Sequence, residues 1–134
     1  IRDLIAAGKL IPKNSFHGKT AALHDSCYLG RYNGMYDAPR EALRALPHLH
    51  LEEPALSRDR GRCCGAGGGR MWMEEKSGTR ISHRRLGDMT VGTSATIIAS
   101  SCPFCLTMLS DAVKETGTEA IEVRDVAELV AESL

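Results

Sequence analysis

Short apolar runs that alternate with helix-forming segments constrain the fold of this chain more than any other sequence feature. The clearest run, TIIAS at 96–100, is typical of a buried strand, and Pro103 suits the first turn of a helix that ends at Gly117. Further strands are predicted over 19–25, 48–52 and 120–123, with other helices over 37–46, around 71–89 with an interruption near Gly78, and from a capping box at Asp125 and Glu128 onward. This alternation predicts an α/β fold, with a small parallel sheet of about four strands flanked by helices.

Composition excludes several classes of function. The 134 residues, of which 43% are hydrophobic, are enough for one domain with one core. The 17 basic and 17 acidic residues cancel, so nucleic acid is not an expected partner. The longest apolar stretch, 96–109, is interrupted by polar residues and falls short of the roughly 20 residues that cross a bilayer, so no membrane span is expected in this segment.

The five cysteines are the candidate functional residues. Their odd number rules out complete disulfide pairing, which favours a reducing compartment in which thiolates are available to a metal. Cys27 and Cys102 each follow a predicted strand, and ligands gather at the carboxyl ends of strands in open α/β sheets. Cys102 and Cys105 are three residues apart at a helix start, so they share a face and the helix dipole favours their thiolate forms. We therefore expect the distant cysteines to converge on the carboxyl edge of the sheet.

The adjacent pair Cys63-Cys64 indicates a centre with more than one metal atom. Neighbouring side chains in extended backbone point apart and cannot easily bind the same atom, whereas a cluster offers several irons. The glycines that follow, beginning with Gly65, allow the backbone to approach inorganic sulfide and donate N–H hydrogen bonds. Soft thiolate ligands select iron–sulfur clusters or zinc over hard cations.

Other interpretations stay open at this stage. Four of the five thiolates could form a structural zinc site, which would make the domain an interaction module without redox function. Some cysteines could instead be small buried hydrophobic residues. The glycine run at 65–69 lacks the pattern and the preceding strand of a nucleotide-binding loop.

Three further groups have a structural and a functional interpretation. His24 could tune or protonate a bound substrate, although a histidine in such a place more often satisfies a backbone hydrogen bond. The segment 71–73 (MWM) could shield a metal centre from water or be ordinary core. A basic cluster could contact an anionic substrate or an acidic redox partner, although a solvated helix face is the favoured interpretation; it comprises Arg80, His83, Arg84 and Arg85.

The cysteine pattern resembles the CCG cysteine-rich domain of the B-type subunit of heterodisulfide reductase, of glycolate oxidase iron–sulfur subunits and of related iron–sulfur-binding reductases. The likeness covers most of the chain and is greatest to the carboxyl-terminal end of heterodisulfide-reductase-related oxidoreductases, including those that move electrons from electron-transfer flavoprotein to menaquinone. The strings that carry the resemblance are HDSCYLGRYNGMYDAPRE, CCGAGGGRMWMEE, ISHRR and SCPFCLTML. One departure is Ser26, where many relatives have proline, and it removes no ligand.

The resemblance implies an oxidoreductase component that holds a 4Fe–4S cluster, noncubane in the heterodisulfide reductase branch, and relays electrons to or from a flavin, disulfide or quinone partner. Its ligands would be Cys27, Cys63, Cys64, Cys102 and Cys105. Family members usually carry a second CCG repeat and often a ferredoxin-like part. We therefore expect residues 1–18 to be the tail of a missing upstream domain and 19–134 to form the CCG domain. The expected partners are that upstream part and a flavoprotein or other redox subunit. The expected location is cytoplasmic, with association to the inner face of the cell membrane through the missing part or a partner.

Overall fold

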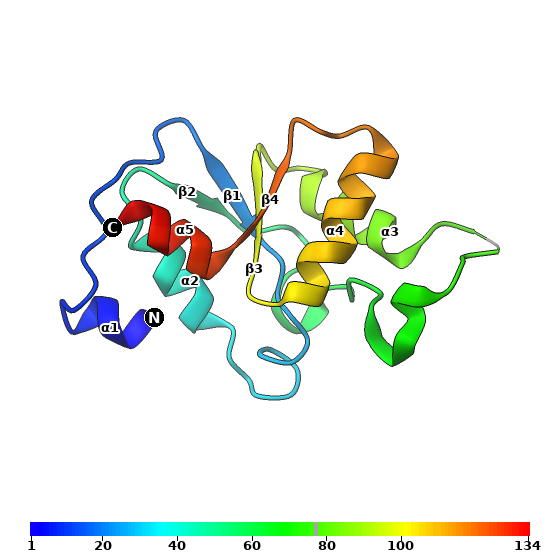
Figure 1. The fold of residues 1–134 in the computed structure, drawn as a ribbon, viewed down its shortest axis with the longest axis horizontal. Helices are drawn as coiled ribbons and strands as arrows, with labels where there is room; N and C mark the ends of the chain where they lie inside the picture. The colour runs from blue at the N-terminus through cyan, green and yellow to red at the C-terminus, as the bar shows by residue number, and fades with distance from the viewer. Residues whose placement is uncertain (77) are drawn as a thin grey trace.

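Four parallel strands form the centre of the fold (Figure 1). A computed structural model describes residues 1–76 and 78–134. The strands are β1 (Thr20–Leu23), β2 (His50–Glu52), β3 (Ile97–Ser100) and β4 (Glu122–Asp125), in the spatial order β2-β1-β3-β4. Ala21 lies opposite Leu51 on one side and Ile97 on the other, and Ile98 lies opposite Val123. The predicted α/β class and parallel sheet are confirmed.

Helices cover both faces of this sheet. α2 (Asp37–Arg44) and α5 (Val126–Ser133) pack on one face, and α3 (Ile81–Thr90) and α4 (Pro103–Thr116) pack on the other (Figure 1). A short helix, α1 (Arg2–Ala6), lies beside α2. Two 3-10 turns, η1 (Arg58–Arg60) and η2 (Gly67–Trp72), occur in the long connection between β2 and α3.

Alternation along the two central strands divides the core into two clusters. Ala21, Leu23 and Ile97 contact the α2–α5 side, whereas Ala22 and Ile98 contact the α3–α4 side. Because both faces of the sheet are buried, the central strands are apolar at successive positions instead of alternating with polar ones. β2, by contrast, is partly exposed and lies at the edge of the sheet.

The prediction of a helical stretch over 71–89 was wrong in its first half. α3 begins only at Ile81, and η2 ends at Trp72. Met73 is extended, with φ of −98° and ψ of 140°, and Gly78 is left-handed, with φ of 75°, so neither continues a helix. Ser77, in the same predicted stretch, lies outside the described residues.

The first residues of the chain pack against the core formed by the rest. Phe16 is buried in the α2–α5 cluster, and Ile5 and Leu10 are packed against it. The backbone N–H groups of Lys13 and Asn14 both donate to the carbonyl of Ser133. The domain boundary at residue 18 stays a prediction. In the described part of the chain, no helix is both long enough and apolar enough to cross a membrane.

The order of the strands opens a crevice between β1 and β3. The chain leaves β1 through α2 toward one edge of the sheet, and it leaves β3 through α4 toward the other edge, on the opposite face. Such a reversal separates the two loops at the carboxyl ends of the central strands, which is where ligands bind in open α/β sheets. Cys27 follows β1 at this place, and Cys102 follows β3.

Candidate metal centre

All five cysteines line one cavity of about 710 Å³ at the carboxyl ends of β1 and β3, called here the sulfur cavity. Cys27 stands in the turn after β1, and Cys102 and Cys105 stand at the start of α4. Cys63 and Cys64 arrive from the long connection between β2 and α3. The predicted convergence of distant cysteines at this edge of the sheet is therefore present in the structure. Their role as ligands stays a prediction.

Burial differs among the five sulfur-bearing side chains. Cys64 and Cys105 are buried, Cys63 and Cys102 are half-buried, and Cys27 is exposed. Cys64 and Cys105 pack with Met108 in a small cluster of their own, apart from the two large core clusters. The cavity therefore has a closed inner end at Cys64 and Cys105 and a more open end at Cys27.

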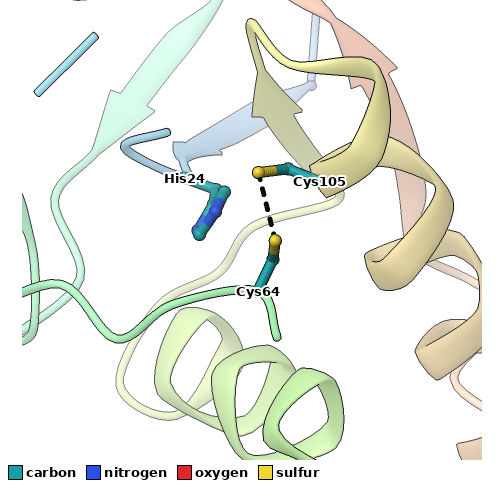
Figure 2. A group of neighbouring side chains, drawn as sticks. All are labelled: His24, Cys64 and Cys105. Carbon is teal, nitrogen blue, oxygen red and sulfur yellow. Dashed lines mark hydrogen bonds between the residues drawn. The ribbon is translucent and has the colours of Figure 1, made fainter. Parts of the chain in front are cut away.

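A sulfur–sulfur contact joins α4 to the loop before α3. The Cys105 thiol donates to the Cys64 sulfur across 3.3 Å, and Figure 2 shows the two side chains directed toward each other. Cys105 occupies the first turn of α4 because Pro103 begins this helix directly after Cys102. The helix start thus holds one sulfur in the interior while Cys102 stays nearer the surface.

Gly65 fixes the backbone after the cysteine pair. Its N–H donates to the Cys63 sulfur at 3.3 Å. Its φ of +91° is a conformation that side-chain-bearing residues rarely adopt, and an added Cβ would lie 3.0 Å from the Cβ of Ile81. Glycine is thus required here by both conformation and space. Its N–H reaches a cysteine sulfur, and donation to inorganic sulfide stays a prediction.

The sulfur–sulfur contacts favour the protonated thiols in the metal-free protein. The 3.3 Å contact with Cys105 raises the pKa of Cys64 to about 11, because a negative charge on one sulfur disfavours a second one beside it, and burial acts in the same direction. The hydrogen bond with the Cys64 thiol, together with burial, raises the pKa of Cys63 above its ordinary value. A metal bound by these residues would have to displace their protons, as thiolate-ligated metals do.

His24 is a member of this site that sequence reasoning placed only beside Cys27. It is the residue after β1, and a ring nitrogen lies within 4.8 Å of the Cys64 and Cys105 sulfurs (Figure 2). Its Nδ1 accepts a hydrogen bond of 3.0 Å from Nε of Arg85. Burial, assisted by the positive charge of Arg85, lowers the pKa of His24 to about 3, so the ring is neutral.

Arg85 corrects the expectation of a solvated basic helix face. Arg80 and His83 pair with Glu115 at the surface and Arg84 is exposed, but the side chain of Arg85 is fully buried. The physical reason is that Arg85 lies on the inner side of α3, where His24 and the Leu56 carbonyl accept its N–H groups. A buried cation therefore stands behind the inner end of the sulfur cavity.

A second buried arginine ties together two loops that carry cysteines. Arg40, from α2, forms paired hydrogen bonds with Asp25 at 2.6 and 2.9 Å and with Glu53 at the same two distances. Asp25 also accepts the backbone N–H of Arg58 at 2.7 Å. Burial alone would raise the pKa of Asp25, but the bonds from Arg40 and Arg58 hold it below its ordinary value. Asp25 precedes Cys27, and Arg58 lies in the loop that leads to Cys63.

Two residues of the segment 71–73, Met71 and Trp72, line the sulfur cavity. Met71 packs against the Cys64–Cys105 cluster, whereas the Trp72 side chain is 82% exposed. Met73 is exposed as well. The ordinary-core interpretation is therefore wrong for Trp72 and Met73. Phe104 and Tyr28 add two more exposed aromatic rings to the mouth of this cavity.

The donors and charges around the cavity fit an anionic, thiolate-bound metal cluster. Five soft sulfur donors face one space, whereas a tetrahedral zinc site would use four. A smaller adjoining space of about 10 Å³ shares Cys27, Cys63, Cys64 and Cys105 with the sulfur cavity and is also lined by Arg31, Arg58, Arg62 and Asp25. The guanidinium of Arg31 acts to lower the pKa of Cys63, against the effects that raise it. Three guanidinium groups thus lie near the place where thiolates would add negative charge, although Arg58 pairs with Asp37 and Arg62 with Asp88.

Comparisons with known proteins agree with the cysteine pattern. The model of the CCG family, described as a cysteine-rich domain, matches residues 21–110. The chain is 47% identical to the probable iron–sulfur-binding oxidoreductase FadF of Bacillus subtilis, over all of the chain and 19% of the relative. It is 41% identical to the EtfAB:quinone oxidoreductase of Syntrophomonas wolfei, over 97% of the chain and 19% of the relative.

A third relative is a subunit of a heterodisulfide reductase. The chain is 38% identical to the D-type subunit of the dihydromethanophenazine:CoB–CoM heterodisulfide reductase of Methanosarcina barkeri, over all of the chain and 32% of the relative. The chain therefore spans about a fifth to a third of the length of these curated relatives.

Proposed function

Because this chain belongs to the CCG family of cysteine-rich domains, we propose that it is an iron–sulfur electron-transfer domain of an oxidoreductase. In this proposal five thiolates hold a 4Fe–4S cluster, of the noncubane type that the heterodisulfide reductase resemblance implies. The ligands are Cys27, Cys63, Cys64, Cys102 and Cys105, with the Gly65 N–H beside them. When bound, such a cluster accepts and releases single electrons.

The observation that carries the proposal is the meeting of five sulfurs from three separate segments at one cavity. Adjacent residues such as Cys63 and Cys64 can both be used by a cluster with several irons. A zinc ion would need four of the five thiols, and the fifth would have no role at the centre. The names of the relatives, which include an iron–sulfur-binding oxidoreductase and a quinone oxidoreductase, agree with a redox role.

The partners that we propose follow from the relatives and from the mouth of the cavity. The relatives are several times longer than this chain, which leaves room for a second CCG repeat or a ferredoxin-like part next to this domain. A flavoprotein, a quinone site or a disulfide substrate is the proposed source or destination of electrons. The exposed rings of Trp72 and Phe104 border the opening through which such a partner would approach.

Metal analysis after anaerobic purification tests the proposal directly. About four irons and four acid-labile sulfides per chain are expected. One zinc ion without sulfide would instead establish the alternative, a zinc-stabilised interaction module.

Two cysteine variants test the ligand set. Cys64→Ser and Cys102→Ser should each lower bound iron and visible absorbance, because each removes a thiolate from a different segment of the cavity. Ser110→Ala is a matched control on α4, because Ser110 belongs to the helix that carries Cys105 but does not line the sulfur cavity. Full iron content and unchanged spectra in both cysteine variants would refute the assignment.

A further inference from the structure

The two buried arginines differ in how well their charge is neutralised. Arg40 is bracketed by two carboxylates, each within 3 Å of its guanidinium. Among the described residues, the carboxylate that pairs with Arg85 is Asp88, at 3.9 Å, and Asp88 is shared with Arg62 at 3.4 Å. Asp25 also acts on Arg85 but lies beyond ion-pair distance, so the charge on Arg85 is only partly compensated.

The hydrogen bonding of the Arg85 guanidinium is also incomplete. Nε donates to His24 at 3.0 Å and one terminal nitrogen donates to the Leu56 carbonyl at 2.7 Å. Among the residues that the structure describes, the other terminal nitrogen is buried without a hydrogen-bond acceptor, and Oδ2 of Asp88 is buried without a hydrogen-bond donor. Removing a charge from water is costly unless it is paired and fully hydrogen-bonded. An added negative charge nearby would offset part of that cost.

The inner end of the sulfur cavity is where such a charge would arise. The His24 ring bridges the space, since Nδ1 accepts from Arg85 and a ring nitrogen lies within 4.8 Å of the Cys64 and Cys105 sulfurs. Burial lowers the pKa of Arg85, and negative charge on the Cys105 sulfur acts in the opposite direction. Arg85 and the inner sulfurs are thus coupled electrostatically.

His24 is held in a state that does not suit a metal ligand. Because Nδ1 of the neutral ring accepts from Arg85, the proton of that ring lies on Nε2. A histidine that binds a metal normally donates its other ring N–H to an acceptor such as a carboxylate or a carbonyl. Here the group at Nδ1 is a donor and a cation. His24 is therefore a polar bridge between Arg85 and the sulfurs.

We propose that Arg85, acting through His24, is a positioning residue that raises the reduction potential of the centre held at Cys64 and Cys105. This inference rests on the proposed function. Reduction adds one electron from a one-electron mediator dye, which is itself oxidised by one electron, and no bond is made or broken. The site becomes more negative by one unit of charge, and the fixed positive charge of Arg85 favours that form over the oxidised one.

The test measures the midpoint potential of the cluster-loaded protein by mediated redox titration. Arg85→Gln keeps a hydrogen-bond donor for His24 but removes the charge. It should shift the ratio of reduced to oxidised cluster at fixed potential at least ten-fold toward the oxidised form, which for one electron is a decrease of about 59 mV. Arg85→Lys keeps the charge and should shift the ratio less than Arg85→Gln does.

Arg84→Gln is the matched control, because it removes the same charge from the next residue on α3, which is exposed. Its effect should be less than two-fold, because solvent screens an exposed charge. Equal shifts in Arg84→Gln and Arg85→Gln, or an unchanged potential in an Arg85→Gln protein with full iron content, would overturn the inference.

If Arg85→Gln loses its iron, its reduction potential cannot be measured, and Asp88→Asn then tests the inference instead. This variant removes the partial counter-charge of Arg85 and leaves the arginine in place, so the potential should rise, and an unchanged or lower potential would overturn the inference. Failure of the proposed function gives a different result, because wild-type protein would then contain no iron or sulfide. A loaded wild type with unresponsive variants would refute the role of Arg85 alone.

Discussion

Arg40→Met probes the clamp between the loops that carry Cys27 and Cys63. The substitution keeps most of the side-chain volume of Arg40 but removes five hydrogen bonds to Asp25, Glu53 and the Tyr36 carbonyl. The Asp25 side chain is 4% exposed and would be left as an unpaired buried charge, whereas that of Glu53 is 36% exposed and is partly screened by water. Most of the cost should therefore come from Asp25.

The expected loss is about 3–5 kcal/mol in the free energy of unfolding, the usual cost of removing one partner from a buried ion pair. A chain of this length loses about 3.5 °C of Tm per kcal/mol, so Tm should fall by about 10–18 °C. Urea and thermal unfolding, followed by circular dichroism in the presence of a thiol reductant and at matched metal content, measure the change. The loops it holds also position two cysteines, so bound iron should decrease as well.

Arg44→Met is the matched control on the same helix. Arg44 lies 3.9 Å from Glu53 and its side chain is 56% exposed, so the change should stay within about 0.5 kcal/mol. Adding Asp25→Asn to Arg40→Met should recover part of the loss, because the buried position then carries no unpaired charge. If Arg40→Met is no more destabilising than Arg44→Met, the reasoning about the clamp is wrong.

Two further predictions concern the backbone at Gly65 and the ion pair between Lys19 and Glu122. Gly65→Ala should lower the free energy of unfolding by about 1–3 kcal/mol and reduce iron binding, because φ is +91° and the new Cβ would meet Ile81. The control Gly67→Ala has open space around the new Cβ and should lower it by less than about 1 kcal/mol. Equal urea midpoints for the two variants would contradict this expectation. Lys19 donates to Glu122 at 2.7 Å, and this pair lowers the pKa of Glu122 in the folded protein. The pair stabilises the fold by less than about 1 kcal/mol, because both side chains are partly exposed. This stabilisation is fully present above the pKa of Glu122 in the unfolded chain, about 4.3, and is lost as pH falls through the lower pKa of the folded protein. Lys19→Met should reduce the loss of stability below about pH 4.3 in urea titrations, and an unchanged acid limb would exclude this contribution.

The sheet and its helices could be predicted because their signals are local. The run at 96–100 is apolar throughout most of its length and becomes β3, Pro103 begins α4, and Asp125 and Glu128 form the predicted capping box of α5. The meeting of the cysteines could be predicted for a related reason, since residues that follow parallel strands share one edge. Which sulfurs bind metal depends on a group outside the polypeptide and stays a prediction.

The buried polar side chains could not be predicted in the same way. A lysine or arginine is exposed by default, and the exceptions depend on partners that only the fold supplies. Helical spacing does place Arg85 on the same face as Met89, but the groups that accept its N–H groups, His24 and the Leu56 carbonyl, are far away in sequence. The position of His24 beside Cys64 and Cys105 could not be predicted either. It exists only once β1, β3 and the loop before α3 have come together in the fold.

The pairing of β1 with β3 has a consequence for biogenesis. Ala21 lies opposite Ile97, so one wall of the sulfur cavity comes from the early part of the chain and the other from a much later part. A growing polypeptide that has not yet released α4 from the ribosome holds three of the cysteines without Cys102 and Cys105. The complete set of five sulfurs exists only after that helix has emerged, so under the proposed function iron can be delivered to all five only on a chain whose synthesis has passed this point.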